Sequence, residues 1–250
     1  MVPPTRFRTG PAFCRAGCFG LLLAASASLP ANTTTVFSPD VSDGEWAWEY
    51  RTSLEPEQDG SDDVFAHRLH VQHAFSGTWR ARLIVAQRSI GGEALDTRYS
   101  RLEIQQQLLE DESAGWDSAL RYELQVAHDG GADRVRIAWT GKWDLDDNWQ
   151  LRANTLFGRE FGDDSDSGIL LEGRAQATRR VAPDVRLGLE LFSDLGTTAD
   201  LPSYNGQEHQ FGPILKAGLN RNWTLNVGYL RGISDSAPDN NFRLLLEWAL

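Results

Sequence analysis

The sequence has 250 residues, a formal net charge of −11 and 41% hydrophobic residues, including 9 Trp, with 23 Gly. This length suits one large domain, and this composition excludes a disordered chain. No segment offers about 18 consecutive apolar residues, so the sequence predicts no transmembrane helix. It also lacks a phosphate-binding glycine loop, a zinc pattern and a nucleic-acid-binding patch, so we expect no cofactor, no metal and no nucleic acid partner.

The first 27 residues predict a cleaved signal peptide. A basic start with three arginines precedes a short apolar run over 19–25, and Ala25-Ser26-Ala27 matches the small-x-small cleavage pattern, with Ala31 as a second possible end. The run is too short to span a bilayer as a helix, and a buried N-terminal helix is the alternative. Because Cys14 and Cys18 both fall here, the mature chain would have no cysteine.

We expect residues 28–44 to form a short periplasmic segment and residues 45–250 to form one all-β domain. From about residue 45 the chain alternates apolar and polar residues in segments of roughly ten residues, the period of a strand with one apolar face. In chain order the apolar sets begin at Trp46, Phe65, Trp79, Leu102, Trp116, Val135, Trp149, Ile169, Val185, Phe211, Trp223 and Phe242.

These segments predict about twelve strands, an even number that suits a transmembrane antiparallel up-and-down β-barrel. Short turns alternate with longer loops, as expected for the periplasmic and external ends of such a barrel. The short turns lie near 75–78, 145–148, 182–184 and 220–222, and the longer loops near 55–63, 89–97, 128–133, 158–168, 194–208 and 231–241.

Tryptophans recur where strands leave the short turns, and Asp147-Asn148-Trp149 is similar to Arg221-Asn222-Trp223. Tryptophan rings favour the headgroup layer of a membrane, so this placement predicts an aromatic girdle. Its expected members are Trp79, Trp116, Trp149, Trp223 and Trp248.

A soluble barrel with the two faces exchanged shows the same alternation, but twelve strands would leave an interior too wide for side chains to fill. The sequence therefore favours the outer membrane of a Gram-negative bacterium, with membrane lipid and lipopolysaccharide as partners. The closing segment, Phe242 to Leu250, resembles the C-terminal strand that the barrel-insertion machinery recognises, with Leu250 in place of the usual Phe.

Arginine dominates the face that the alternation turns toward the interior, and glutamates such as Glu103 and Glu123 lie between the arginines. Cationic walls favour anions, which predicts a passive channel for small anionic or polar solutes. Arg–Glu pairs between strands could instead plug the lumen and give a structural or assembly-related barrel. The expected lumen-lining cations are Arg80, Arg82, Arg121, Arg134, Arg136, Arg152, Arg174, Arg186, Lys216 and Arg243.

Twelve strands and an arginine-lined interior resemble the small monomeric porins for acidic oligosaccharides. The C-terminal part, with Phe211-Gly212-Pro213, the strand from Trp223 and Ala237-Pro238-Asp239, also resembles the phenol-degradation MetA-pathway barrel family over roughly residues 209–250. Both resemblances imply transport and assign no binding residue.

An outer-membrane lipid-modifying enzyme is the enzymatic alternative, because His67 and His73 fall on the outward face of their segment. Nucleophilic catalysis also needs a serine beside the histidine and a group that orients it. No motif supplies these partners, so we expect no catalytic residue and a non-enzymatic protein.

Overall fold

The computed structural model describes residues 32–250, apart from residue 59 and residues 112–114. The predicted signal peptide and both cysteines lie outside the described residues. The one helix of the described part is a single 3-10 turn, η1 (Tyr204–Gly206). No described helix is long and apolar enough to cross a membrane.

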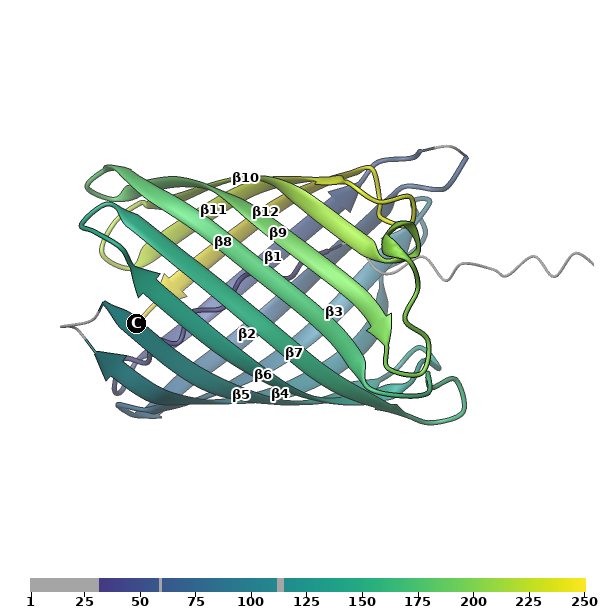
Figure 1. Cartoon of the computed structure of the whole chain (residues 1–250), viewed down its shortest axis with the longest axis horizontal. Helices are drawn as coiled ribbons and strands as arrows, with labels where there is room; N and C mark the ends of the chain where they lie inside the picture. The colour runs from purple at the N-terminus through teal and green to yellow at the C-terminus, as the bar shows by residue number, and fades with distance from the viewer. Residues whose placement is uncertain (1–31, 59, 112–114) are drawn as a thin grey trace, which may run out of the picture.

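Twelve antiparallel strands close into a single barrel, which confirms the predicted fold (Figure 1). Each strand pairs with its neighbours in sequence, and β1 pairs with β12 to close the ring, from Ala47 opposite Ala249 to Leu54 opposite Phe242. The strands are β1 (Trp46–Glu55), β2 (Val64–Ser76), β3 (Trp79–Ile90), β4 (Asp96–Asp111), β5 (Trp116–Ala127), β6 (Asp133–Asp144), β7 (Trp149–Phe161), β8 (Leu170–Ala182), β9 (Val185–Thr197), β10 (Glu208–Gly218), β11 (Trp223–Gly232) and β12 (Asn240–Ala249).

The two faces of the barrel wall are opposite in character. Charged side chains are buried on the inner face, where Arg121 is 2% and Glu123 4% exposed, whereas Leu83 and Leu124 on the outer face are 62% and 51% exposed. Exposure of so continuous an apolar outer surface is unfavourable in water and favourable in the hydrocarbon of a membrane. The chain is therefore an outer-membrane β-barrel, and the soluble alternative is excluded.

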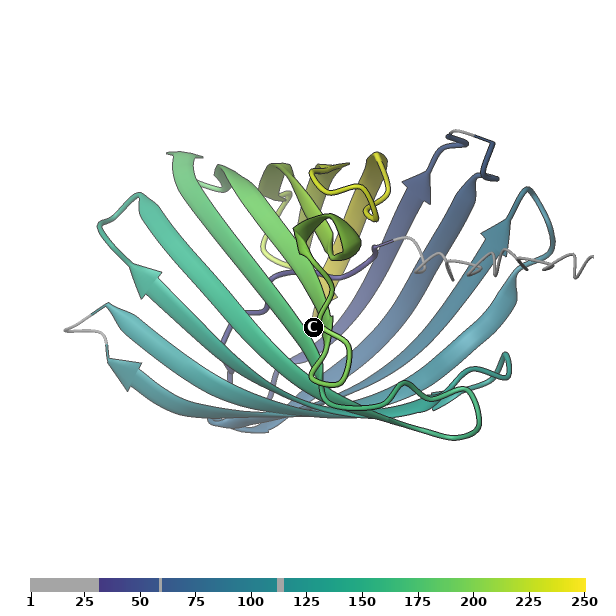
Figure 2. The ribbon, with the colours of Figure 1, turned by 45° about the vertical axis from the view of Figure 1, so that its right-hand side comes forward.

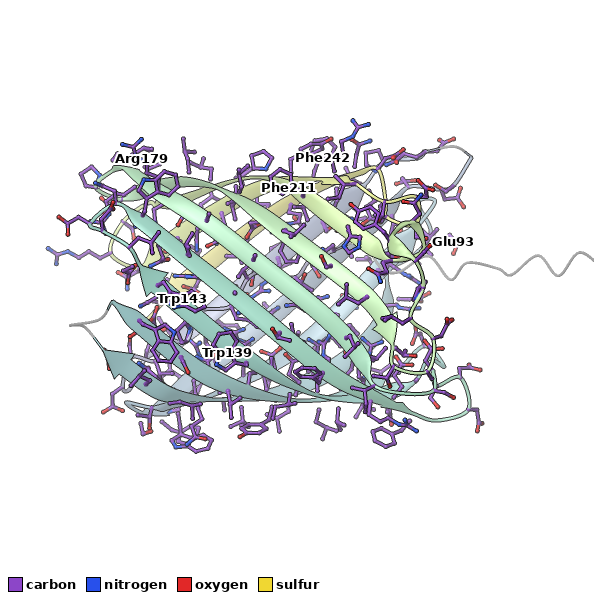
Figure 3. The ribbon with its side chains drawn as sticks, viewed as in Figure 1. Glu93, Trp139, Trp143, Arg179, Phe211 and Phe242 are labelled. Atoms are coloured by element: carbon purple, nitrogen blue, oxygen red, sulfur yellow. The ribbon has the colours of Figure 1, made fainter. Side chains whose placement is uncertain are left out.

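Aromatic side chains project from this outer face, as Figure 3 shows for Trp139, Trp143, Phe211 and Phe242. The rings of Trp139 and Trp143 meet at 6.0 Å above Gly141 on β6. A Cβ atom at Gly141 would lie 2.5 Å from the Trp143 ring, so only glycine permits this aromatic contact. This part of the aromatic outer surface therefore depends on the glycine between the two tryptophans of β6.

A shared side-chain cap explains the sequence repeat at the short turns. Asp146 Oδ1 accepts hydrogen bonds from the backbone N–H groups of Asn148 and Trp149, both at 2.7 Å. The Trp149 and Asn148 donors hold the pKa of Asp146 below its usual value. Ser76 and Asn220 cap their turns in the same way, with neutral oxygens. These caps fix where the strands begin.

Residues 32–44 run through the barrel interior before β1 begins, as the purple segment in Figure 2 shows. At the long-loop end the Asn32 side chain donates to Gln210 Oε1 at 2.8 Å, and toward the short-turn end the Val41 N–H donates to Gln107 Oε1 at 2.9 Å. This placement corrects the prediction of a periplasmic segment for these residues. We call residues 32–44 the lumenal segment.

Candidate functional site

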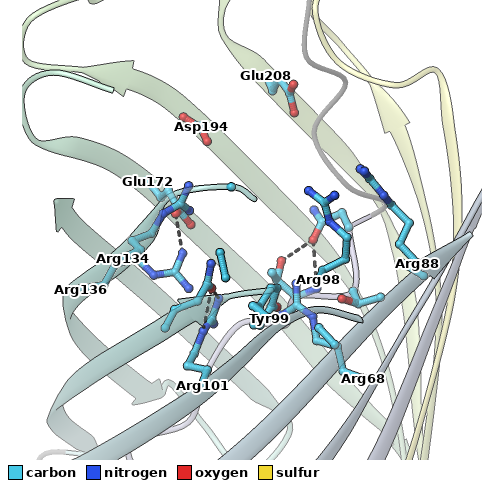
Figure 4. Close-up of a pocket in the computed structure, with 18 of the residues that line it drawn as sticks. Arg68, Arg88, Arg98, Tyr99, Arg101, Arg134, Arg136, Glu172, Asp194 and Glu208 are labelled. Carbon is cyan, nitrogen blue, oxygen red and sulfur yellow. Dashed lines mark hydrogen bonds and ion pairs between the residues drawn. The ribbon is translucent and has the colours of Figure 1, made fainter. Parts of the chain in front are cut away.

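Within the part of the chain that the structure describes, two larger cavities lie in the lumen. The outer cavity, at the long-loop end, has a volume of about 380 Å³ and is lined by Arg68, Arg88, Tyr99, Asp194 and Glu208, among others (Figure 4). The inner cavity, at the short-turn end, has a volume of about 310 Å³ and is lined by Asp40, Arg80, Arg152, Lys216 and Glu247, among others. The lumenal segment contributes residues to both cavities, so it passes between them.

Buried ion pairs fill the cross-section between the cavities. Glu103 Oε2 accepts from Arg121 Nη1 at 2.9 Å and lies 3.4 Å from Arg82 Nη1. Glu123 Oε2 lies 2.6 Å from Arg136 Nη2. Each carboxylate contacts arginines of neighbouring strands, which offsets the cost of removing these charges from water. We call this group of residues, together with Arg174 and Phe37, the central layer.

Phe37 of the lumenal segment lies within the central layer. Its ring centre is 3.5 Å from Arg121 Cζ and 4.7 Å from Arg174 Cζ, so two guanidinium groups contact one ring. The Phe37 N–H also donates to Asn154 Oδ1 at 2.7 Å. The lumenal segment is thereby fixed at the centre of the barrel by ring contacts and by a backbone hydrogen bond.

Apolar contacts with the lumen wall hold the same segment. Phe37 packs against Leu156, while Val36 packs against Phe192 and Leu230. Leu156, Phe192 and Leu230 occupy inward positions in strands whose other inward residues are mostly polar or charged. Sequence reasoning missed the lumenal segment, although these three inward apolar residues were a signal that something apolar covers them.

The structure turns the predicted lumen cations inward. Nine of them line one of the cavities or a small gap between them, and Arg186 lies at the short-turn end, where it donates to Thr178 Oγ1 at 3.1 Å. The central layer contains Arg82, Arg121, Arg136 and Arg174. Arg134 lines the outer cavity, and Arg80, Arg152 and Lys216 line the inner cavity. Arg243 pairs with Glu190 at 2.7 Å.

The lumen cations fall into a paired and an unpaired class. Most contact a carboxylate, which sequence periodicity alone did not reveal. Among the described residues, seven inward cations have no carboxylate oxygen within 4.0 Å. These are Arg68, Arg80, Arg88, Arg152, Arg180, Arg186 and Lys216.

The predicted girdle residues lie at the short-turn end of the barrel. Trp79, Trp116, Trp149 and Trp223 are each the first residue of a strand, and the rings of Trp223 and Trp248 stack at 5.8 Å. The sequence thus predicted their common height, and a role at the membrane interface stays a prediction.

The solved structures that share this fold include the following three. The COG4313 outer membrane channel from Pseudomonas putida F1 matches with a TM-score of 0.65 at 12% identity, covering 86% of this chain and 98% of that one. The NanC porin gives 0.57 at 14% identity, covering 83% and 100% of the two chains. The KdgM porin in complex with disordered oligogalacturonate gives 0.55 at 13% identity, covering 81% and 98%. At these identities the likeness shows the fold alone.

A comparison with curated proteins found no matching sequence. A family model described as "Putative MetA-pathway of phenol degradation" matches residues 102–245, well beyond the C-terminal part that carried the resemblance in the sequence. The matched range runs from β4 to β12 and includes most of the central layer. The chain therefore belongs to the MetA-pathway of phenol degradation family of outer-membrane barrels.

Proposed function

We propose that this barrel is a passive outer-membrane channel for small anionic or polar solutes. Each cavity has the volume of a small-molecule site, and together they extend along the lumen from the long-loop end to the short-turn end. The central layer with the lumenal segment is the barrier between them. A solute would pass where this segment shifts or where its polar contacts exchange.

The observation that carries the anion preference is the charge of the inner cavity. Arg80, Arg152 and Lys216 face it without a carboxylate partner among the described residues, whereas two carboxylates there, Glu45 and Glu247, are without a cation partner. Unpaired cations in a narrow, low-dielectric space attract anions. The relative solved with oligogalacturonate supports small solutes for a barrel of this architecture.

The second candidate function is a structural or assembly-related barrel with a plugged lumen. It is favoured by the central layer, where the buried ion pairs and Phe37 fill the cross-section. This candidate predicts no conductance from the intact protein and no gain when single lumen cations are neutralised.

The enzymatic alternative has little support. Among the described residues, the ring nitrogens of His67 have no hydrogen-bond partner, and His73 Nδ1 contacts the Glu45 carbonyl at 3.3 Å and no serine. A different pair forms at the long-loop end, where Ser100 Oγ lies 2.9 Å from His128 Nε2. No described carboxylate contacts His128 to orient it as a base. We therefore propose a non-enzymatic channel.

We further propose that residues 1–27 are removed on export and that β12 is recognised by the barrel-insertion machinery. The exposed side chains of Phe242, Leu244 and Trp248 on β12 support contact with the membrane or the machinery. Lipid and lipopolysaccharide are the proposed partners of the outer wall.

Reversal potentials in planar bilayers with a salt gradient test the proposal. We expect conductance with anion preference, and we expect R80Q together with R152Q to weaken that preference. R159Q is the matched control, because Arg159 lies on the outer face of the strand that carries Arg152 and donates to the Gly168 carbonyl. No conductance, or cation preference in the wild-type protein, would contradict the proposal.

A further inference from the structure

The outer cavity, like the inner one, keeps unpaired charges of both signs among the described residues, and here they lie on two facing walls. Its other arginines have partners: Arg136 pairs with Glu172 at 2.7 Å, and Arg134 and Arg98 form ion pairs with Glu160 and Asp129. Figure 4 shows Arg136 beside Glu172, and it also shows the charged groups that have no ion-pair partner.

Glu55 also lines the cavity without an ion-pair partner, but it accepts a hydrogen bond from Asn241 Nδ2 at 2.7 Å. Asp164 and Asp166, on the loop after β7, line it without an ion pair as well. The unpaired charges that face each other lie on two walls, one cationic and one acidic.

The cationic wall is formed by Arg68 on β2 and Arg88 on β3. Arg68 is only 8% exposed, lines the cavity and has no hydrogen-bond or ion-pair partner among the described residues. Its Cζ lies 5.5 Å from the centre of the Tyr99 ring, which leaves its N–H groups unused. A guanidinium buried to this extent is unfavourable unless an anion comes to it.

The acidic wall is formed by Asp194 on β9 and Glu208 on β10, which are direct register partners. Asp194 Oδ1 accepts from the Gly196 N–H at 3.0 Å, and neither carboxylate has a described cation within 4.0 Å. Two adjacent carboxylates repel each other, and a cation between them relieves that repulsion.

The two walls face each other across the lumen. In the closed ring of twelve strands, β3 and β9 lie six places apart, which is halfway round the barrel. Figure 4 shows Asp194 and Glu208 on one side of the cavity and Arg68 and Arg88 on the other. The field across the cavity therefore points from the arginine wall to the acidic wall.

We propose that the outer cavity binds small zwitterions, molecules with one carboxylate and one cationic nitrogen at opposite ends. The carboxylate pairs with Arg68 and Arg88, and the cationic nitrogen pairs with Asp194 and Glu208. The Tyr99 ring lines the cavity beside Arg68, at the arginine wall, and offers the apolar linker a contact there. A simple anion satisfies one wall only, and so does a simple cation. This inference rests on the proposed channel function and names the solute class that its outer mouth selects.

Calorimetry on the full protein in detergent tests the inference without requiring conductance. The probes are 6-aminohexanoate, hexanoate and hexylammonium, which share a linker and differ in their charged ends. We expect 6-aminohexanoate to bind at least about tenfold more tightly than either of the others, because it alone neutralises both walls.

Variants assign the two ends. R68Q should weaken binding of both 6-aminohexanoate and hexanoate, whereas D194N with E208Q should weaken 6-aminohexanoate and leave hexanoate unchanged or tighter. E93Q is the matched control, because Glu93 lies on an exposed loop outside the cavity (Figure 3). The heat-dependent mobility of each variant on gels reports whether its barrel is folded.

Two results would overturn the inference: equal affinity for hexanoate and 6-aminohexanoate, or unchanged zwitterion affinity in folded D194N/E208Q protein. Either result leaves an anion-selective conductance intact, so the channel proposal would survive. Conversely, a barrel that binds 6-aminohexanoate but never conducts would refute the channel and retain the binding site.

Discussion

The central layer and the outer cavity use the same residue types for different purposes. In the central layer, Glu123 lies between Arg136 at 2.6 Å and Arg101 at 3.2 Å. In the outer cavity, Arg68 has no charged partner among the described residues, and neither has Glu208. Compensated charge rigidifies a barrel, whereas uncompensated charge beside a cavity is free to bind a ligand. Predictions about the lumen therefore depend on pairing and not on residue type.

The largest expected effect comes from removing the part of the lumenal segment that fills the central layer. Deletion of residues 33–41 should raise the single-channel conductance severalfold, because the two cavities then join. F37A is the smaller companion change and should give an intermediate conductance, since it removes only the ring between Arg121 and Arg174. Unchanged conductance in the deletion variant would mean that the ion pairs alone close the lumen.

Breaking one central ion pair should destabilise the barrel. We expect E123Q to lower the free energy of unfolding by about 3–5 kcal/mol, because Arg136 and Arg101 lose their shared buried partner. The midpoint of urea unfolding, followed by gel mobility, measures this loss. E160Q is the control: the side chains of Arg134 and Glu160 are 23% and 9% exposed, so this pair is less buried than that of Glu123 and we expect a smaller loss of about 1–2 kcal/mol. Equal losses would erase the distinction between the two regions.

Neutralising the unpaired Arg68 should change the stability of the barrel in the opposite direction. R68Q should leave the unfolding midpoint unchanged or raise it, because the variant removes a buried charge that has no partner among the described residues. The same urea titration measures it. A loss as large as that of E123Q would show that Arg68 supports the fold and is not held free for a ligand.

The smallest effect is expected at a turn, where water screens the charge. The lowered pKa of Asp146 means that its cap stabilises the fold above the usual aspartate pKa and is lost as the pH falls through the lowered value. D146N should remove this dependence and keep the turn, as Asn220 already does in the turn before β11. Unfolding midpoints measured between about pH 5 and about pH 2 check the difference. A wild-type profile identical to that of D146N would contradict it.

The sequence determined the fold and the two faces of the wall. Because side chains of a strand alternate strictly, each residue's face follows from its number, and Leu83 and Arg82 could be assigned to lipid and lumen without coordinates. The short turns also follow from neighbouring residues in the sequence. A tryptophan three residues after the capping oxygen of Asp146 or Asn220 marks where a strand begins. Strand number and topology follow from these local patterns.

Only the tertiary structure decided which charges are compensated and what lies in the lumen. The contacts of Glu123 with Arg101 and Arg136 depend on the register of three strands, and the adjacency of Asp194 and Glu208 depends on the register of β9 and β10. The lumenal segment has no periodicity of its own, so its position follows from distant contacts such as those of Phe37. Periodicity is a local property that the sequence displays directly, whereas register and the packing of an irregular segment depend on residues far apart in the chain.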